Sequence, residues 1–227
     1  MTHSGGRIVS VNVGTPRPVS FRGKEIMTSI FKEPVAGRVV VAGINLEGDD
    51  QADRKVHGGV DKAVYAYAAE DYAWWARELD RELPPGMFGD NITTSGIDVS
   101  GGVIGERWRV GTSLLEVAQP RIPCFKLGIR MGTQTFPRRF SQARRPGAYL
   151  RIVEAGEAGA GDQIEPIGKP EHGLTVRDVA YIYYAEPERA AELLSAPQLA
   201  ESWIGWAHHR LARPPQGIQA RTPRDQE

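Results

Sequence analysis

The chain has 227 residues, of which 41% are hydrophobic and 25% are charged. These proportions are ordinary for a globular protein, and they exclude extended disorder, a collagen repeat and a coiled coil. The 28 Lys and Arg residues balance the 28 Asp and Glu residues, so the chain has no overall basic field that would attract nucleic acid or an anionic membrane. An anion-binding site must therefore be local.

The sequence contains no pattern for membrane insertion or export. No stretch approaches the roughly 18 consecutive apolar residues of a membrane span, and the opening MTHSGGR lacks the basic and apolar regions of a signal peptide. The single cysteine, Cys124, cannot form an internal disulfide, which suits a reducing compartment. We expect a cytoplasmic protein that binds neither a membrane nor a nucleic-acid polymer.

Residues 7–170 carry mostly short, alternating apolar segments. Val9, Val11 and Val13 alternate with polar residues, which is typical of a β-strand. Further strands are predicted over residues 27–31, 38–42, 63–68, 107–110, 114–118, 149–153 and 163–167. Seven or eight short strands favour a closed or nearly closed β-barrel.

Helices are expected at two places within this region. The first has an apolar stripe at helical spacing behind two acidic residues and before Pro84, and the stripe consists of Tyr72, Trp75, Ala76, Leu79 and Leu83. The second stretch covers residues 125–144, where Gly128, Gly132 and Pro137 divide it into short pieces. The first helix is predicted to cover the barrel.

The apolar period changes from strand-like to helical after Pro170. Thr175 and Asp178 have the spacing of a helix capping box, and two more helical patterns follow before the chain becomes polar. We therefore predict a β-barrel domain over residues 7–170, a three-helix domain over residues 174–213 and a flexible tail over residues 214–227.

Aromatic residues are concentrated in the predicted three-helix domain. They are Tyr181, Tyr183, Tyr184, Trp203 and Trp206. A domain of about 40 residues is too small to bury all of this aromatic area. The sequence therefore predicts a homodimer.

Residues 48–63, GDDQADRKVHGGVDKA, form a predicted loop around the glycine pair Gly58-Gly59. Glycine permits positive φ, so the backbone N–H groups can face an anion. Cationic donors nearby are Arg54, Lys55, His57 and Lys62. A phosphate or an oxyanion would suit this loop, but a plain turn with its charges in solvent explains the pattern as well.

Two further segments place polar residues beside prolines. In FGDNIT, Asp90 and Asn91 fall in a strand-entry loop, where an Asx turn explains them without a ligand. In QPRIPCFKL, Cys124 lies between Arg121 and Lys126, whose charges favour a thiolate, and a helix start adds its dipole. A reactive thiol and an inert core cysteine both remain open interpretations.

The three segments, in this order, resemble the MOSC domain family, which is named for the C-terminal domain of molybdenum cofactor sulfurase. In particular they resemble its bacterial stand-alone YiiM-type branch, which carries a small C-terminal three-helix domain. The resemblance extends over about residues 9–210. It implies a mainly β fold, with a MOSC-type β-barrel, peripheral helices and a small all-α C-terminal domain.

The resemblance also implies a bound molybdenum cofactor, molybdopterin, with Cys124 at the metal-ligand position. A soft thiolate suits a metal that is already held through sulfur. The residues that the resemblance assigns to the cofactor are Lys32, Arg54, His57, Gly58, Gly59, Lys62, Asp90, Asn91 and Arg121. The family usually has a glutamate where this chain has Asp90, so the carboxylate arm is one methylene shorter.

The activity implied by the resemblance is the reduction of small N-hydroxylated compounds, such as hydroxylaminopurines and amidoximes. Cys124 and His57 are the expected catalytic residues, with His57 as the proton source because imidazole titrates near neutral pH. No flavin or iron–sulfur motif is present, so the electrons are expected from a separate reductase.

Two alternatives remain open. One is a carrier of the cofactor or of sulfur on Cys124 without reductase activity. The other is a molybdenum-free enzyme that combines Cys124, His57 and Asp61 as nucleophile, base and orienting acid.

Overall fold

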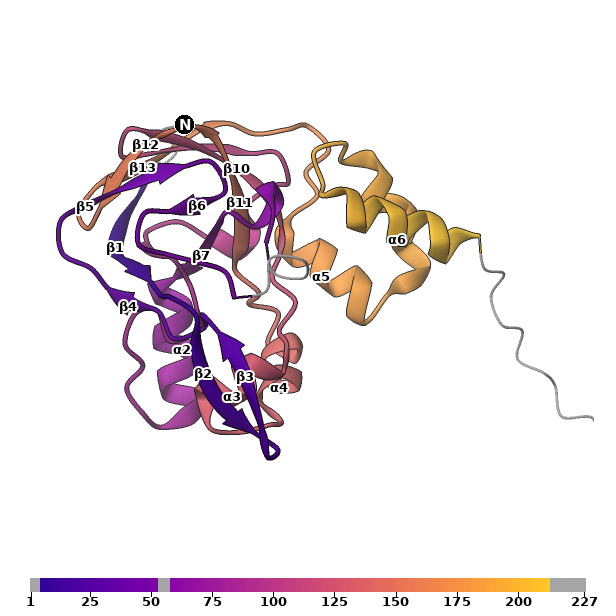
Figure 1. Ribbon diagram of the computed structural model, residues 1–227. Coiled ribbons are helices and arrows are strands. Elements are labelled where there is room, and N and C mark those ends of the chain that lie inside the picture. Colours follow the sequence, from indigo (N-terminus) through magenta and orange to yellow (C-terminus); the bar gives the residue numbers. More distant parts are fainter. Residues whose placement is uncertain (1–4, 53–57, 213–227) are drawn as a thin grey trace, which may run out of the picture.

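The computed structural model describes residues 5–52 and 58–212 of the chain. Its centre is a closed barrel in which the strands pair in the order β13-β9-β10-β11-β7-β8-β1, and β13 pairs back onto β1 (Figure 1). The strand bounds are β1 (Gly6–Val13), β7 (Val64–Ala68), β8 (Ile92–Ser95), β9 (Arg107–Val110), β10 (Ser113–Pro120), β11 (Ala148–Glu154) and β13 (Gln163–Gly168). All neighbouring pairs are antiparallel except β7 and β8, which are parallel. The mainly β fold and the predicted barrel are confirmed.

Smaller strands extend the barrel. The short strand β4 (Glu33–Pro34) pairs with β1, and β12 (Gly156–Gly159), β5 (Arg38–Ala42) and β6 (Asn45–Leu46) form a separate sheet. A hairpin of β2 (Arg17–Phe21) and β3 (Lys24–Thr28) projects below the barrel (Figure 1). The strand predicted over residues 27–31 therefore lies earlier, because the chain leaves β3 after residue 28 to form part of a pocket wall.

The helices of the first 170 residues cover the lower side of the barrel in Figure 1. They are α2 (Ala69–Leu79), α3 (Phe125–Met131) and α4 (Phe136–Gln142), with short 3₁₀ turns η1 (Val60–Lys62) and η2 (Val99–Gly101). Asp80 adopts a left-handed conformation with φ 48° and ends α2, so Leu83 lies beyond the helix. Gly132, with φ 73°, ends α3, which confirms the predicted break between two short helices.

Two apolar clusters hold these layers together. One fills the barrel interior and continues into the C-terminal helices, with Val11, Val117 and Val179 fully buried. The other is aromatic and lies between the barrel and its helices, where the rings of Trp75 and Phe140 stack 5.9 Å apart. Burial of large aromatic side chains is a dominant source of stability, so this cluster fixes α2 and α4 onto the barrel.

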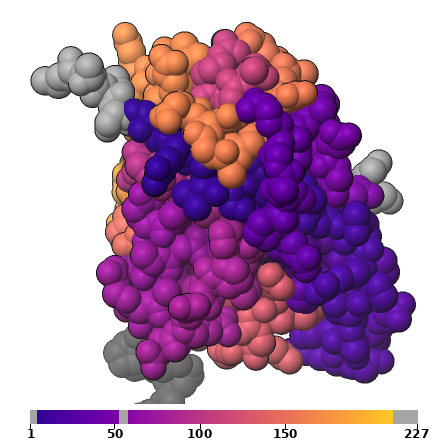
Figure 2. Space-filling view, turned by 90° about the vertical axis from the view of Figure 1, so that its left-hand side faces the viewer, coloured from indigo at the N-terminus to yellow at the C-terminus, as the bar shows by residue number. Residues whose placement is uncertain are grey.

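The C-terminal residues form α5 (Val176–Tyr184), a 3₁₀ helix η3 (Pro187–Ser195) and α6 (Glu201–Leu211). They lie at one side of the barrel in Figure 1 and are largely hidden behind it in Figure 2. Trp203 Nε1 donates a hydrogen bond to Gln119 Oε1 at 2.8 Å, which joins α6 to β10. The predicted capping box at the start of α5 is present. The division of the chain into two domains and a tail stays a prediction.

Within the described residues, none of the helices combines the length and the apolar character that crossing a membrane requires.

Candidate functional site

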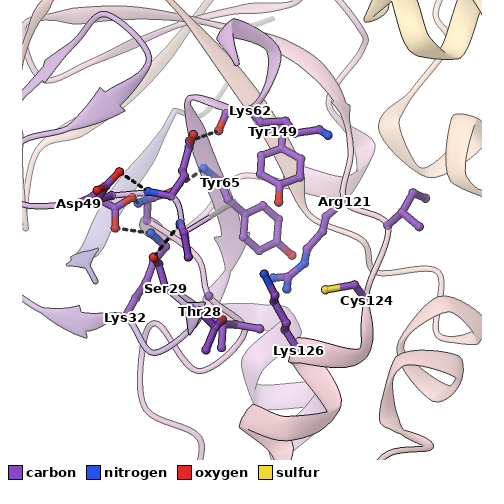
Figure 3. Close-up of a pocket in the computed structure, with 17 residues that line it drawn as sticks. Thr28, Ser29, Lys32, Asp49, Lys62, Tyr65, Arg121, Cys124, Lys126 and Tyr149 are labelled. Atoms are coloured by element: carbon purple, nitrogen blue, oxygen red, sulfur yellow. Dashed lines mark hydrogen bonds and ion pairs between the residues drawn. The ribbon is translucent and has the colours of Figure 1, made fainter. Parts of the chain in front are cut away.

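A pocket opens where the end of β3, the segment before η1 and the segment between β10 and α3 meet (Figure 3). It encloses about 660 Å³ including the solvent at its open mouth. Residues that the sequence assigned to the site line this one pocket, and they are Lys32, Lys62, Asn91, Arg121 and Cys124. The fold thus brings together side chains that are up to 92 positions apart in the sequence.

One wall of the pocket is an ion pair between Lys32 and Asp49. The Asp49 carboxylate also accepts hydrogen bonds from Asn91 Nδ2 at 2.9 Å and from the backbone N–H of Gly14 at 2.8 Å. Burial lowers the pKa of Lys32, and the neighbouring Asp49 opposes this effect. Asp49 therefore holds both Lys32 and Asn91 in place, and it balances the lysine charge on this wall.

Asn91 is fixed to β7 through its backbone and its side chain. Its N–H donates to the Tyr65 carbonyl at 2.7 Å, and its Oδ1 accepts from the Tyr65 N–H at 3.1 Å. Because both amide ends of the Asn91 side chain are engaged, its orientation toward the pocket is set before any ligand binds.

Asp90 lies behind the pocket wall and is not among the residues that line the pocket. Its carboxylate accepts hydrogen bonds from Tyr72 Oη and Thr93 Oγ1, each at 2.6 Å, and its carbonyl accepts from Asn12 Nδ2 at 3.1 Å. Complete burial raises the pKa of Asp90, against the effect of the Thr93 and Tyr72 hydrogen bonds. In this structure Asp90 contacts β1, β8 and α2, and its contribution is to hold the loop that carries Asn91.

Arg121 is a buried cation at the centre of the pocket. Its Nη1 donates to the Phe88 carbonyl, and its guanidinium lies 4.9 Å from the centre of the Tyr65 ring. Gly89 has φ 75°, and a Cβ there would lie 3.0 Å from Ile30 Cγ1 and 3.5 Å from Arg121 Nη1. The left-handed backbone conformation favours glycine at this position of the FGDN segment, and a larger side chain would also crowd Ile30.

Cys124 immediately precedes α3 and is half-buried, and Figure 3 shows its sulfur pointing toward Lys126 and Arg121. Burial is the largest single effect on the pKa of Arg121 and lowers it. The combined electrostatic effects of Tyr65, Tyr149 and Cys124 are larger, so the net pKa of Arg121 is raised. The thiol and the guanidinium are thus electrostatically coupled, and adjacent cations favour the thiolate form of a cysteine.

Tyr149 stands above Arg121 in Figure 3, with its hydroxyl directed toward the guanidinium. Its ring packs 5.1 Å from that of Tyr65, whose own hydroxyl donates to the Pro146 carbonyl at 2.8 Å. Burial raises the pKa of Tyr149 and Arg121 lowers it, with burial the larger effect. The phenol therefore keeps its proton at neutral pH and can serve as a donor inside the pocket.

The glycine pair precedes η1, and Lys62 at the end of η1 lines the pocket. Gly59 has φ 102°, the positive φ that the sequence suggested glycine would permit here, and the anion-binding role of the pair stays a prediction. Gly58 and Gly59 are not among the lining residues. Arg54 and His57, which the sequence also assigned to the cofactor, lie outside the described residues.

Sequence reasoning missed Asp49, Tyr65 and Tyr149 as pocket residues. Asp49 belongs to the charged loop, but nothing in its spacing distinguishes it from Asp50. The two tyrosines occupy strand positions, where an aromatic residue is more often core than site. Among the described residues, no group of three or more His, Cys, Asp and Glu side chains is arranged to hold a metal ion.

The comparisons with known proteins agree with this geometry. Residues 53–165 match the MOSC domain family. Protein YiiM of Escherichia coli (strain K12) is 32% identical over 183 residues, which are 78% of this chain and 81% of that protein. The crystal structure of YiiM from Geobacillus stearothermophilus has a TM-score of 0.75 and 30% identity, and the match covers 91% of this chain and 99% of that one.

A protein of Gibberella moniliformis (strain M3125 / FGSC 7600) named "Reductase" is 29% identical over 199 residues. The match covers 85% of this chain and 35% of that protein.

The barrel and its cysteine-containing pocket define a MOSC-type β-barrel protein. The chain belongs to the MOSC domain family, in its YiiM-type branch. The predicted family is confirmed, and membership relates the function of the protein to the molybdenum cofactor, with which MOSC domains are associated.

Proposed function

We propose that the protein is a molybdenum-cofactor-dependent reductase of small N-hydroxylated compounds. The observation that carries the proposal is the position of Cys124, a soft thiol that opens into the same pocket as Lys62, Arg121 and Lys126. The relative named "Reductase" supports an oxidoreductase role.

The chemistry of the lining residues fits the cofactor. A thiolate suits a metal held through sulfur, and a pterin phosphate requires cationic groups such as Lys62, Lys126 and Arg121. Lys32 is less suited to this task, because Asp49 already balances its charge. We therefore expect Cys124 to contact the metal and the remaining cations to hold the anionic part of the cofactor.

The reaction converts R–NH–OH, two electrons and two protons into R–NH₂ and water. When bound, the cofactor supplies the two-electron redox centre. The chain supplies orientation and protons: Asp49 fixes the amide of Asn91, and Tyr149 holds a proton on Oη beside Arg121. His57 is the other proposed proton source.

Cys124→Ser tests the function. The variant should fold, since sulfur and oxygen differ little in volume, but it should lose reduction of benzamidoxime with reduced methyl viologen and change the absorption spectrum of the bound metal centre. Ile129→Val, a change of one methylene in the following helix, is the matched control and should keep both properties. Wild-type turnover in Cys124→Ser would exclude the thiol as a ligand.

If the protein is a carrier of the cofactor without reductase activity, the same assays should give a different result. Wild-type protein that contains stoichiometric pterin and metal, yet reduces neither benzamidoxime nor 6-N-hydroxylaminopurine with reduced viologen, would be a carrier of the cofactor rather than a reductase.

A further inference from the structure

A second hollow lies on the other side of the segment that carries Cys124. It is a groove between α4, the chain that follows α4, and α5, and it encloses about 1280 Å³ including its open side. Arg121 lines both the pocket and the groove, Pro123 lines the groove, and Cys124 lines the pocket. A single extended segment of chain therefore forms the wall between them.

The lining of the groove is apolar at its base and cationic at its rim. The partly exposed Pro123 and Pro137 contribute apolar surface, and Tyr181 and Tyr184 contribute aromatic surface. The charged residues around it are Arg121, Arg138, Arg144 and Arg177, and none of the described residues that line it is acidic.

The rim arginines differ in how they are engaged. Arg177 pairs with Asp98 at 3.0 Å, and the Arg144 guanidinium stacks 3.7 Å from the centre of the Tyr181 ring. Arg138 is exposed and contacts no acidic side chain in the part of the chain that the structure describes. Since the whole chain has a formal net charge of zero, this cationic rim is a local feature that can orient an approaching negative partner.

The proposed reaction requires an electron donor, because each substrate molecule consumes two electrons. The groove comes within one chain segment of Cys124. A donor protein seated in the groove would therefore lie close to Cys124 without covering the mouth of the pocket.

We infer that the groove between α4 and α5 is the docking surface for an acidic electron-transfer protein that carries a flavin or an iron–sulfur cluster. This inference rests on the proposed function. The partner is oxidised by two electrons for each N–O bond broken, and the substrate nitrogen is reduced. One of the two protons consumed completes the amine, and the other converts the released hydroxide into water. Arg138 and Arg144 attract the acidic surface, and the apolar base of the groove takes a contact residue of the partner.

The test measures binding and turnover with two acidic donors, a plant-type [2Fe–2S] ferredoxin and a flavodoxin. The double variant Arg138→Glu/Arg144→Glu should bind at least one of them about tenfold or more weakly at low ionic strength, mainly through slower association. Added salt should weaken wild-type binding and reduce this difference. Arg138→Glu alone, at an exposed position, repeats the test without disturbing the contact between Arg144 and Tyr181.

Arg7→Glu/Arg77→Glu is the matched control. It changes the net charge by the same amount at exposed positions on β1 and α2 that do not line the groove, and it should bind like wild type. Reduced methyl viologen provides a small cationic donor that gains nothing from arginines, so the viologen-driven rate of the groove variants should equal that of wild type.

The outcomes separate the two proposals. If wild type and the groove variants bind the donors equally well and show equal donor-driven turnover, the proposed docking surface is wrong. It is also wrong if neither donor binds wild type in a salt-dependent way. A wild type that binds a donor through the groove but reduces no N-hydroxylated substrate with viologen would instead refute the proposed function.

Discussion

Asp90 and Asn91 are adjacent in the sequence, but their side chains have different tasks. Asn91 lines the pocket and is held by Asp49, whereas Asp90 is completely buried and bonded to Tyr72 and Thr93. The Asp90 carboxylate, which is one methylene shorter than the glutamate usual in the family, therefore makes its hydrogen bonds inside the protein and not in the pocket. Its effect on the pocket is indirect, through the loop that carries Asn91.

Asp90→Asn should change how stability depends on pH. Burial raises the pKa of Asp90 above its usual 3.8, so between 3.8 and the raised value the folded state binds more protons than the unfolded state. The free energy of unfolding of wild type should therefore fall as pH rises through this window, and Asp90→Asn should not show this part of the fall. Urea denaturation between about pH 4 and pH 8 measures the difference.

Glu25→Gln, which removes an exposed carboxylate from β3, is the matched control for Asp90→Asn. Wild-type and Asp90→Asn curves that run parallel over the whole range would show that Asp90 does not titrate differently in the folded state.

Tyr149→Phe should slow turnover while leaving the content of metal and pterin unchanged. The ring contact with Tyr65 is kept, and only the hydroxyl beside Arg121 is lost. Loss of a general acid costs about 100-fold or more in kcat, and the basic limb of the pH–rate profile should move. An unchanged kcat and pH profile would assign the proton transfer elsewhere, with His57 the next residue to test.

At the scale of elements, the short segment between β10 and α3 performs two tasks. It leaves the barrel at Pro120, presents Cys124 to the pocket and Pro123 to the groove, and then starts α3. Prolines on either side of Ile122 restrict this segment to extended conformations. This extended segment thus forms the wall between the pocket and the groove.

The capping box at the start of α5 gives a stability prediction. Thr175 Oγ1 accepts from the Asp178 N–H at 3.1 Å, and Asp178 Oδ2 accepts from the Thr175 N–H at 3.1 Å. Thr175→Ala should lower the free energy of unfolding by about 1 kcal/mol. Thr133→Ala, at an exposed position, should change it by less than about 0.5 kcal/mol. Equal denaturation midpoints for the two variants would contradict the role of the cap.

At the scale of the whole molecule, we propose that the protein forms a homodimer. Tyr183 is 38% exposed and packs against Trp203 and Trp206 within the C-terminal helices. It does not line the groove between α4 and α5, and its exposed ring leaves aromatic area at the surface that a second copy can cover.

Light scattering at micromolar concentration should give about twice the chain mass of 24.9 kDa, and Tyr183→Glu should shift the protein toward the monomer because a charge in an apolar contact is costly. The matched control Arg77→Glu introduces the same residue on α2 and should leave the mass unchanged. A wild type of single-chain mass would refute the dimer.

Sequence patterns were sufficient to predict the barrel, the helical C-terminal region, the two short helices after Cys124 and the family. These follow from local features: strand and helix periods, glycine and proline positions, a capping box and three contiguous motifs. The same motifs pointed to Lys62, Asn91, Arg121 and Cys124, and the family resemblance of the segment TSIFKEPV pointed to Lys32.

How those segments combine into a pocket depends on the folded arrangement of the chain. Closure of the barrel determines which residues from distant sequence positions line the same cavity. Asp49, Tyr65 and Tyr149 therefore line the pocket although no local sequence pattern indicates it. The packing of the elements also buries the Asp90 side chain and leaves a groove on the other side of the segment that carries Cys124. Side-chain direction and inter-element distance depend on packing, which no single stretch of sequence encodes.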